Sequence, residues 1–376
     1  MWGLAGAAAR NTKPMCDLQP KRPTSVQKLL FWGILGALSV CFAEVTVGSS
    51  PFAFFDAWGL LVVCPLYLLH LLVLARVAFA RGPPRFPALF FAGVLFGLYE
   101  AYMTKQLWNP DWSSDPVRAG GVAVFETIIL VLWWHPVMAF LVPLLVAETA
   151  LCRSRHVART LPRRLQRILF GKRGTAVLLV LAVLLGLVLS SDHTLRPSAG
   201  DVFVSGLASV GVLFLLVWLW RRATRGVRMA LPELLPTGRE MVMLCVCLAL
   251  QYVGLGMLVR PEALPALGPQ ASVWLLYVAA ITGLWLGLRR PRPASLFGHA
   301  ESPDRFSWRL WFGLATVLVV TATGSRLLLG SATWLFLIAN LIVGVPVGVV
   351  ILVLCFRDVL RPLRTGPPGG VAFKAP

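Results

Sequence analysis

The stretch at residues 119–150, AGGVAVFETIILVLWWHPVMAFLVPLLVAETA, decides the fold class of this chain. Apart from Glu126, His135 and Glu148, its side chains are apolar or small. A run of about 20 apolar residues is enough to cross a bilayer as a helix. This run would be about 48 Å long as a straight helix, and Pro136 and Pro143 interrupt it. We therefore expect a long membrane span that bends, because proline removes a backbone hydrogen bond.

The composition of the whole chain agrees with that segment. It has 376 residues, of which 57% are hydrophobic and only 14% charged, and its mean hydropathy is +0.76. Apolar runs recur along the chain. They predict an all-α, polytopic bundle of about ten membrane spans at 28–47, 57–79, 87–104, 119–150, 175–191, 202–220, 240–259, 272–288, 309–329 and 333–356.

The basic residues indicate topology. The net charge is +19, but all except five of the 35 Lys and Arg residues fall before the first span, after the last, or in every second connection. The exceptions are Lys105, Arg118, Arg196, Arg260 and Arg326. Cytoplasmic segments of membrane proteins carry this excess. We therefore expect both termini in the cytoplasm and no nucleic-acid partner.

Spans and connections together predict five regions. Residues 1–27 form a cytoplasmic tail, 28–152 a four-span segment, 153–174 a basic connection, 175–356 a six-span apolar bundle, and 357–376 a second cytoplasmic tail. The short loops and the charge distribution predict a multi-pass protein of the bacterial cytoplasmic membrane.

The basic connection has the pattern of a helix lying on a membrane surface. Apolar residues recur at helical spacing among five basic ones between Arg159 and Lys172. Such a helix buries its apolar face at the interface, while its cations attract acidic headgroups. We expect the bilayer, and the anionic lipids of its inner leaflet, to be partners of this region; protein partners are unknown.

Ionisable side chains within spans are costly and are therefore candidates for function. Here they gather in the first four spans: Glu44, His70, Glu100, Glu126, His135 and Glu148. One hypothesis is that these groups share a hydrated pocket. The alternative is separate structural roles, with Glu44 at the interface, His70 in packing, and Glu148 paired with the basic block that starts at Arg153.

The loop at residues 105–118, KQLWNPDWSSDPVR, follows Glu100 closely. Its tryptophans suit an interfacial belt, and its Asn-Pro-Asp and Ser-Asp-Pro sequences favour turns. We interpret Lys105, Trp108 and Asp111 as a lid over the pocket, with Lys105 able to pair with Glu100, and we place Trp134 in the pocket wall.

Depth along the helices predicts which groups meet. At 1.5 Å per residue, Glu100 lies about 12 Å below Trp108 and His135 about 20 Å below Val122. This difference in depth makes Glu126, and not His135, the expected neighbour of Glu100. Two close carboxylates would share a proton.

A short motif nevertheless connects Glu100 and His135. The segment EAYMTK at 100–105, followed by VLWWH at 131–135, resembles the CAAX-processing and bacteriocin-immunity family of intramembrane proteases. The resemblance implies that Glu100 is a general base and that His135 orients water or stabilises an oxyanion. The chain departs from the family pattern at Ala101, Lys105 and Val131, and it lacks the family's later His-x-x-x-Asn.

A longer stretch resembles a second family. The segment EVTVGSSPFAFFD at 44–56, the following NPDW loop and the span with His135 and Glu148 are similar to a family of uncharacterised polytopic membrane proteins. This resemblance implies a membrane fold without an assigned activity.

Three functions remain open from the sequence. The first is an intramembrane peptidase, or its non-catalytic relative, with Glu100 and His135 as the reacting pair. The second is a proton- or cation-coupled transporter that uses Glu100 and Glu126. The third is a structural membrane subunit. No phosphate-binding loop and no clustered set among the seven cysteines is present, so we expect no cofactor and no metal.

Overall fold

The computed structural model describes residues 22–191, 198–289 and 307–361. Its first part contains α1 (Ser25–Val40), η1 (Cys41–Val45), η2 (Gly59–Val63), α2 (Cys64–Ala78), α3 (Phe86–Gly97), α4 (Tyr99–Tyr102), α5 (Val124–Thr127), η3 (Ile128–Leu141) and α6 (Val142–Leu151). The segments η1, η2 and η3 are π-helical. Short strands β1 (Arg118–Ala119) and β2 (Val122–Ala123) pair in the loop before α5, so the chain is mostly helical and not purely so.

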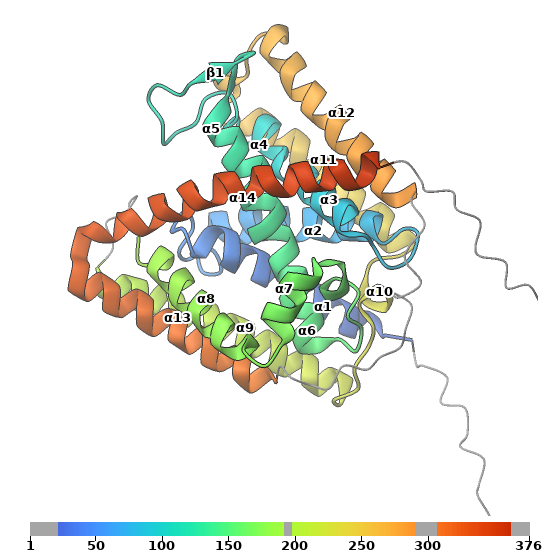
Figure 1. Ribbon diagram of the computed structural model, residues 1–376, viewed down its shortest axis with the longest axis vertical. Coiled ribbons are helices and arrows are strands. Elements are labelled where there is room, and N and C mark those ends of the chain that lie inside the picture. Colours follow the sequence, from blue (N-terminus) through green and yellow to red (C-terminus); the bar gives the residue numbers. More distant parts are fainter. Residues whose placement is uncertain (1–21, 192–197, 290–306, 362–376) are drawn as a thin grey trace, which may run out of the picture.

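The second part is also helical. It contains η4 (Ala158–Thr160), α7 (Arg163–Phe170), α8 (Gly174–Leu189), α9 (Ala199–Thr224), α10 (Leu231–Leu234), α11 (Arg239–Leu258), η5 (Pro261–Ala263), α12 (Leu267–Arg289), α13 (Trp308–Leu329), η7 (Gly330–Thr333) and α14 (Trp334–Leu360). Figure 1 shows α13 and α14 as two long helices that meet at a sharp turn.

A multi-pass helical membrane protein is thus confirmed, while the span count differs from the expected ten. By length and composition, the described residues contain seven helices able to cross a membrane, or eight if α7 and α8 form one bent span. Two regions account for much of the difference. Phe86–Tyr102 is shorter than a standard span, and Arg309–Leu360 counts once although it contains both α13 and α14.

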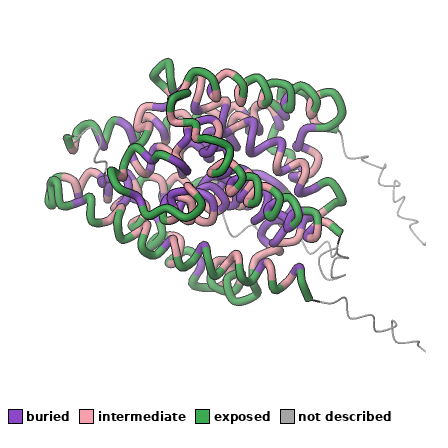
Figure 2. The backbone as a smooth tube through the Cα atoms, turned by 90° about the horizontal axis from the view of Figure 1, so that it is seen from above, coloured by how far each residue is buried: buried purple, intermediate pink, exposed green. Residues whose placement is uncertain are grey.

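The core lies among the first helices. Residues of α1, α2, α3 and η3 supply most of the large, fully buried side chains, and Figure 2 shows the buried backbone at the centre with exposed backbone around it. Helices α9, α11, α12 and α14 instead expose many Leu, Val and Ile side chains. A helix that is apolar on its outer face suits lipid as its surroundings.

Pairs of glycines four residues apart set the closest helix contacts. A Cβ atom added to Gly93 or Gly97 of α3 would meet Pro136 or Val131 of η3 at 2.5–3.0 Å. Gly283 and Gly287 bring α12 against α3, and Gly344 and Gly348 bring α14 against η3. Small residues at this spacing let membrane helices approach closely. Helix α3 is therefore held tightly between η3 and α12.

Where the sequence predicts a bend in the long span, the structure has a π-helical segment. Residues 124–151 form one continuous helical segment of α5, η3 and α6, and Pro136 lies inside the π-helical part. Because proline has no N–H group, a wider turn is a common way to pass it. Such π-helical turns are frequent at functional sites.

Candidate functional site

Among the described residues, Glu100 and His135 bring a buried carboxyl group and a buried imidazole together in the core. Glu100 stands in α4, one turn beyond Gly97, and His135 lies in η3 directly opposite that glycine, 3.2 Å from the position of an added Cβ. The Glu100 Oε1 atom is 3.5 Å from His135 Nε2. The two side chains are 9% and 1% exposed. Close packing at Gly97 thus brings together two groups that helix depth alone had separated.

The backbone determines which nitrogen of His135 faces Glu100. His135 Nδ1 lies 2.9 Å from the carbonyl oxygen of Leu130. A carbonyl can only accept a hydrogen bond, so Nδ1 carries a proton and donates. The Nε2 atom is therefore the titrating atom of the ring, and it points at the carboxyl group of Glu100.

Two tyrosines converge on the same nitrogen. The Tyr99 hydroxyl is 3.1 Å and the Tyr67 hydroxyl 3.4 Å from His135 Nε2, and the two hydroxyl oxygens are 3.4 Å apart. Tyr67 also donates to Glu44. The cluster of Glu44, Tyr67, Tyr99, Glu100 and His135, here called the tyrosine–histidine cluster, therefore contains two carboxyl groups linked through hydroxyls and one imidazole.

Each carboxyl group of the cluster also accepts a hydrogen bond from a hydroxyl residue in a connection between helices. Glu44 accepts a hydrogen bond from the exposed Ser49, and Glu100 accepts one from Thr104. Both hydroxyl residues follow the ends of their helices, in the connections that precede η2 and β1. The cluster therefore lies near one end of the bundle.

These distances fit two arrangements of one proton. With neutral His135, Nε2 accepts from Tyr99 and Glu100 carries the proton, because a bare carboxylate would otherwise face a nitrogen lone pair. With charged His135, Nε2 forms an ion pair with the Glu100 carboxylate at 3.5 Å, and Tyr99 donates to Tyr67. The contact thus offers two places for one proton, the Glu100 carboxyl group and His135 Nε2.

A second histidine lies beside the cluster. His70 Nδ1 contacts the Leu66 carbonyl at 2.8 Å, and its Nε2 contacts the Tyr252 hydroxyl at 3.2 Å. Its ring stacks on Phe96 and lies 5.2 Å from the Tyr99 ring. These contacts satisfy both nitrogens and agree with the expected packing role.

Lys105 does not pair with Glu100, which corrects that expectation. Its ammonium group donates to the carbonyls of Gly256 and Val259, at 2.6 and 2.5 Å. These groups end α11, where a cation interacts favourably with unpaired carbonyls. Burial lowers the pKa of the Lys105 ammonium group. Lys105 therefore secures α11 to the loop.

The other loop residues also make structural contacts. The Asp111 carboxylate pairs with Arg260 at 2.6 Å, and Trp108 is buried against the Tyr102 ring, with centroids 5.1 Å apart. Trp134 Nε1 donates to the Ala43 carbonyl at 2.9 Å and thereby joins η3 to η1. This bond fixes η3 against η1 at the residue before His135.

The remaining two carboxylates stand apart from the cluster. No hydrogen bond among the described residues joins Glu126 to Glu100, and Glu126 Oε2 is buried without a partner there. Glu148 accepts from the backbone N–H groups of His156, Val157 and Ala158 at 2.6–3.1 Å, and from Ser154. The sequence offered the basic block that starts at Arg153 as the partner of Glu148; its carboxylate accepts instead from these N–H groups and the Ser154 hydroxyl, and Arg153 itself pairs with Glu233.

Sequence reasoning missed Tyr67, Tyr99 and the two glycines of α3. Tyrosines within apolar spans were a usable signal, since a buried hydroxyl needs a partner. The GVLFG spacing at 93–97 was another, because it marks a close helix contact. In the described ranges, no group of three or more His, Cys, Asp or Glu side chains is placed to hold a metal ion.

The fold and this buried polar cluster define a multi-pass helical membrane protein. The chain belongs to an uncharacterised membrane protein family, whose model matches residues 33–363. An uncharacterised protein from Archaeoglobus fulgidus is 31% identical over 329 residues, which cover 87% of this chain and 98% of the relative. No solved structure matches the chain. The family match agrees with the expected membership in a family of uncharacterised polytopic membrane proteins.

Proposed function

We propose that Glu100 and His135 form an acid–base centre for hydrolysis within the membrane, as in an intramembrane peptidase. The observation that carries this proposal is the 3.5 Å contact between Glu100 Oε1 and His135 Nε2. A general base must lie within reach of the proton that it takes, directly or through one water. The fixed Nδ1 bond supports the proposal because it presents a single defined nitrogen.

The chemistry needs few groups. The Glu100 carboxylate takes a proton from water, and the water oxygen bonds to the carbonyl carbon of the substrate. The Tyr99 hydroxyl, 3.1 Å from His135 Nε2, is a donor for the resulting oxyanion. The carbon–nitrogen bond then breaks, and Glu100 returns the proton to the leaving nitrogen. His135 keeps the carboxylate oriented through Nε2.

The test uses hydrolysis with water labelled in its oxygen. The protein in lipid nanodiscs is incubated with membrane proteins of its host in this water, and mass spectrometry searches for new termini that carry the label. We expect labelled termini with the wild type and their loss with Glu100→Gln and His135→Ala. Glu126→Gln is the matched control, because it makes the same change at a buried glutamate outside the cluster. Labelled termini that persist in Glu100→Gln exclude the proposal.

A second candidate is proton-coupled transport, and the link from Glu44 through Tyr67 to His135 favours it. Chains of carboxylates and histidines carry protons in pumps and transporters. The structure supports Glu44 in place of Glu126 as the second carboxylate. In proteoliposomes with an internal pH dye, this function predicts substrate-dependent proton uptake that Glu44→Gln abolishes. Unchanged behaviour of Glu44→Gln, Glu100→Gln and His135→Ala in both assays supports a structural subunit.

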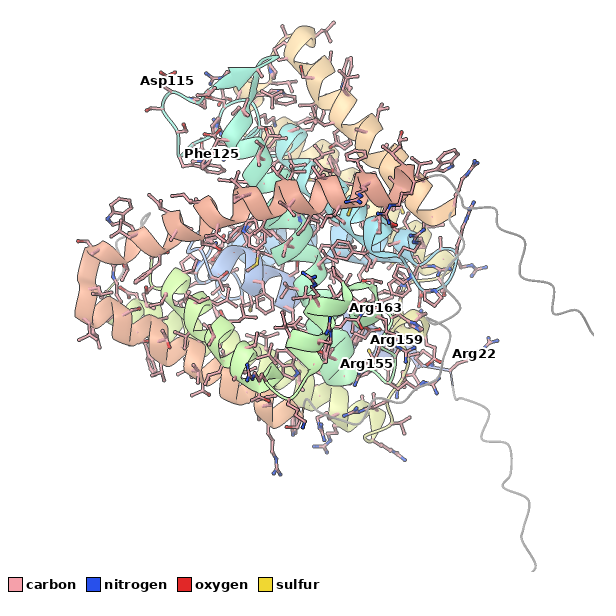
Figure 3. All side chains as sticks on the ribbon, viewed as in Figure 1. Arg22, Asp115, Phe125, Arg155, Arg159 and Arg163 are labelled. Carbon is pink, nitrogen blue, oxygen red and sulfur yellow. The ribbon has the colours of Figure 1, made fainter. Side chains whose placement is uncertain are left out.

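The proposed location is the cytoplasmic membrane of a prokaryote. A relative of similar length is archaeal, and the basic residues concentrate in every second connection along the chain. Figure 3 shows Arg22, Arg155, Arg159 and Arg163 on one side of the molecule and Asp115 on the opposite side. This separation supports a cytoplasmic position for the arginine side.

A further inference from the structure

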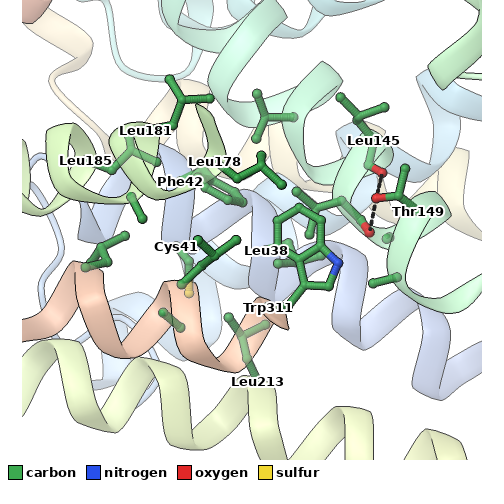
Figure 4. Close-up of a pocket in the computed structure, with 18 of the residues that line it drawn as sticks. Leu38, Cys41, Phe42, Leu145, Thr149, Leu178, Leu181, Leu185, Leu213 and Trp311 are labelled. Carbon is green, nitrogen blue, oxygen red and sulfur yellow. Dashed lines mark hydrogen bonds between the residues drawn. The ribbon is translucent and has the colours of Figure 1, made fainter. Parts of the chain in front are cut away.

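A large apolar cavity lies on the other side of α1 from α2. Its volume is about 420 Å³, and its lining comes from α1, η1, η3, α6, α7, α8, α9 and α13. Figure 4 shows leucines of α1, α8 and α9 with Phe42 and Trp311 around it. The lining is almost entirely apolar.

Two hydroxyl groups of the lining, those of Thr149 and Thr46, are satisfied within their own helices and do not require a polar occupant. Thr149 donates to the carbonyls of Leu145 and Val146 at 2.7 and 3.2 Å, as the dashed lines in Figure 4 mark. Thr46 donates to the Phe42 carbonyl at 2.6 Å. A water molecule in such a space would lack the two or more polar partners that it needs. An empty space of this size would forfeit dispersion contacts along all its walls, so a hydrocarbon is the suitable occupant.

One end of the cavity is closed by a helix that carries positive charge. Leu165, Leu169 and Phe170 of α7 line the cavity, whereas Arg163, Arg164 and Arg167 of the same helix are exposed. Helix α7 makes an angle of 90° with α8, so it lies across the direction of the spans. This is the geometry of an interfacial helix with its apolar face inward.

A second hollow, of about 430 Å³ and bordered by basic residues, adjoins the cavity. Arg221 and Arg222 line it together with Trp218, and the Arg222 guanidinium stacks 5.5 Å from the Trp218 ring centroid. Val217 and Phe312 line both spaces. The apolar cavity therefore continues into a hollow bordered by guanidinium groups, which are suited to bind phosphate.

We propose that the cavity holds an acyl chain of one anionic membrane phospholipid, whose phosphate lies against the arginines of α7 and of the end of α9. The charge of both arginine sets complements an acidic headgroup, and the apolar walls complement the chain. The lipid would fill the space between α1, α8, α9 and α13, and so act as part of the core of the protein. This site is separate from the tyrosine–histidine cluster.

The phospholipid that stays bound to the protein after extraction from the bilayer is a direct measure of this binding. The protein is reconstituted in nanodiscs of equal parts phosphatidylglycerol and phosphatidylcholine, extracted into mild detergent, and analysed by native mass spectrometry. We expect the wild type to keep one phosphatidylglycerol in preference to phosphatidylcholine. Val210→Phe should abolish retention, because Val210 lines the cavity. Val204→Phe makes the same change on the exposed side of α9 and should retain lipid as the wild type does.

The arginines are tested separately. Arg163→Gln combined with Arg167→Gln should lower the preference for phosphatidylglycerol by about fivefold per arginine, since one basic residue near the surface contributes about 1 kcal/mol. Arg76→Gln combined with Arg81→Gln removes the same charge from the last turn of α2 and the connection after it, and should leave the preference unchanged.

Three outcomes would overturn the proposal. They are equal retention by Val210→Phe and the wild type, no preference of the wild type for phosphatidylglycerol, and equal effects of the two arginine pairs. If Val210→Phe fails to fold by circular dichroism, Ala315→Phe fills the same cavity from α13. The arginine variants change exposed or partly exposed side chains and decide the headgroup part in either case.

Discussion

Gly97 and His135 are packed so closely that a methyl group on Gly97 would lie 3.2 Å from His135 Cβ and 2.9 Å from the Leu130 carbonyl oxygen. That carbonyl is also the acceptor for His135 Nδ1. One glycine therefore governs both the approach of α3 to η3 and the environment of the imidazole.

Gly97→Ala should destabilise the protein by about 1–3 kcal/mol, the usual cost of overpacking a tight core. Gly254→Ala is the matched control, because nothing lies within 4 Å of its added Cβ on α11. Helix propensity favours alanine over glycine by up to about 1 kcal/mol, so the control should be neutral or stabilising. Unfolding by denaturing detergent measures the stability of both variants relative to the wild type. Equal stability of the two variants would contradict the close contact.

Glu148 should be the most stabilising carboxylate of the first spans. It accepts three backbone N–H groups and the Ser154 hydroxyl while fully buried. Glu148→Ala leaves these donors unpaired, at about 1–3 kcal/mol for each unsatisfied group, and should prevent stable folding. Glu233→Gln weakens a partly exposed pair with Arg153 and should cost less than about 1 kcal/mol. Thermal unfolding in nanodiscs compares the stability of the two variants. A smaller loss of stability for Glu148→Ala than for Glu233→Gln would refute the prediction.

The buried ammonium group of Lys105 should make the stability of the protein depend on pH. Burial lowers the pKa of its ammonium group below the usual 10.5, so the unfolded chain binds more protons in the interval between the two values. Stability rises with pH wherever the unfolded state binds more protons. We therefore expect the wild type to gain stability as pH rises toward about 10, and Lys105→Met to lose this gain. Detergent unfolding at several pH values measures the slope. Parallel slopes for both proteins would count against a lowered pKa.

The predicted topology places Asp115 outside and Val227 inside the cell. In a background without native cysteines, a cysteine at position 115 should react with a membrane-impermeant maleimide in intact cells. A cysteine at position 227, whose valine is 63% exposed, should react only after the membrane is opened. The reverse pattern would invert the orientation that the basic residues predict.

Residue type and charge were sufficient to predict the membrane class. Long apolar runs have few structural alternatives in a bilayer, and the ionisable residues of the first spans stood out in the sequence as candidates for function. Two of them, Glu100 and His135, do meet. The estimate that separated them assumed straight α-helices starting at a common level, and it could not include the π-helical turns of η3 or the close crossing at Gly93 and Gly97.

Contacts between residues distant in sequence limited the other predictions. Lys105 binds carbonyls about 150 residues later, and nothing in the loop itself indicates that acceptor. Glu148 lies next to an arginine block in sequence, but the backbone of residues 156–158 folds over its carboxylate and satisfies it first. Proximity in the chain favoured an ion pair, whereas the folded backbone supplied closer donors.

The π-helical geometry of η3 makes the register of His135 sensitive to segment length. Its i→i+5 ladder accommodates an additional residue where an α-helix would make an i→i+4 turn. Removing one residue between Glu126 and Pro136 without a change of winding would turn the imidazole by about 100° around the helix axis, whereas a deletion that converts a wide turn to ordinary α-helical winding would keep its direction. Family members could therefore lose the Glu100 contact through a single deletion while keeping every side chain of the site, so the spacing between these positions should distinguish those that retain it.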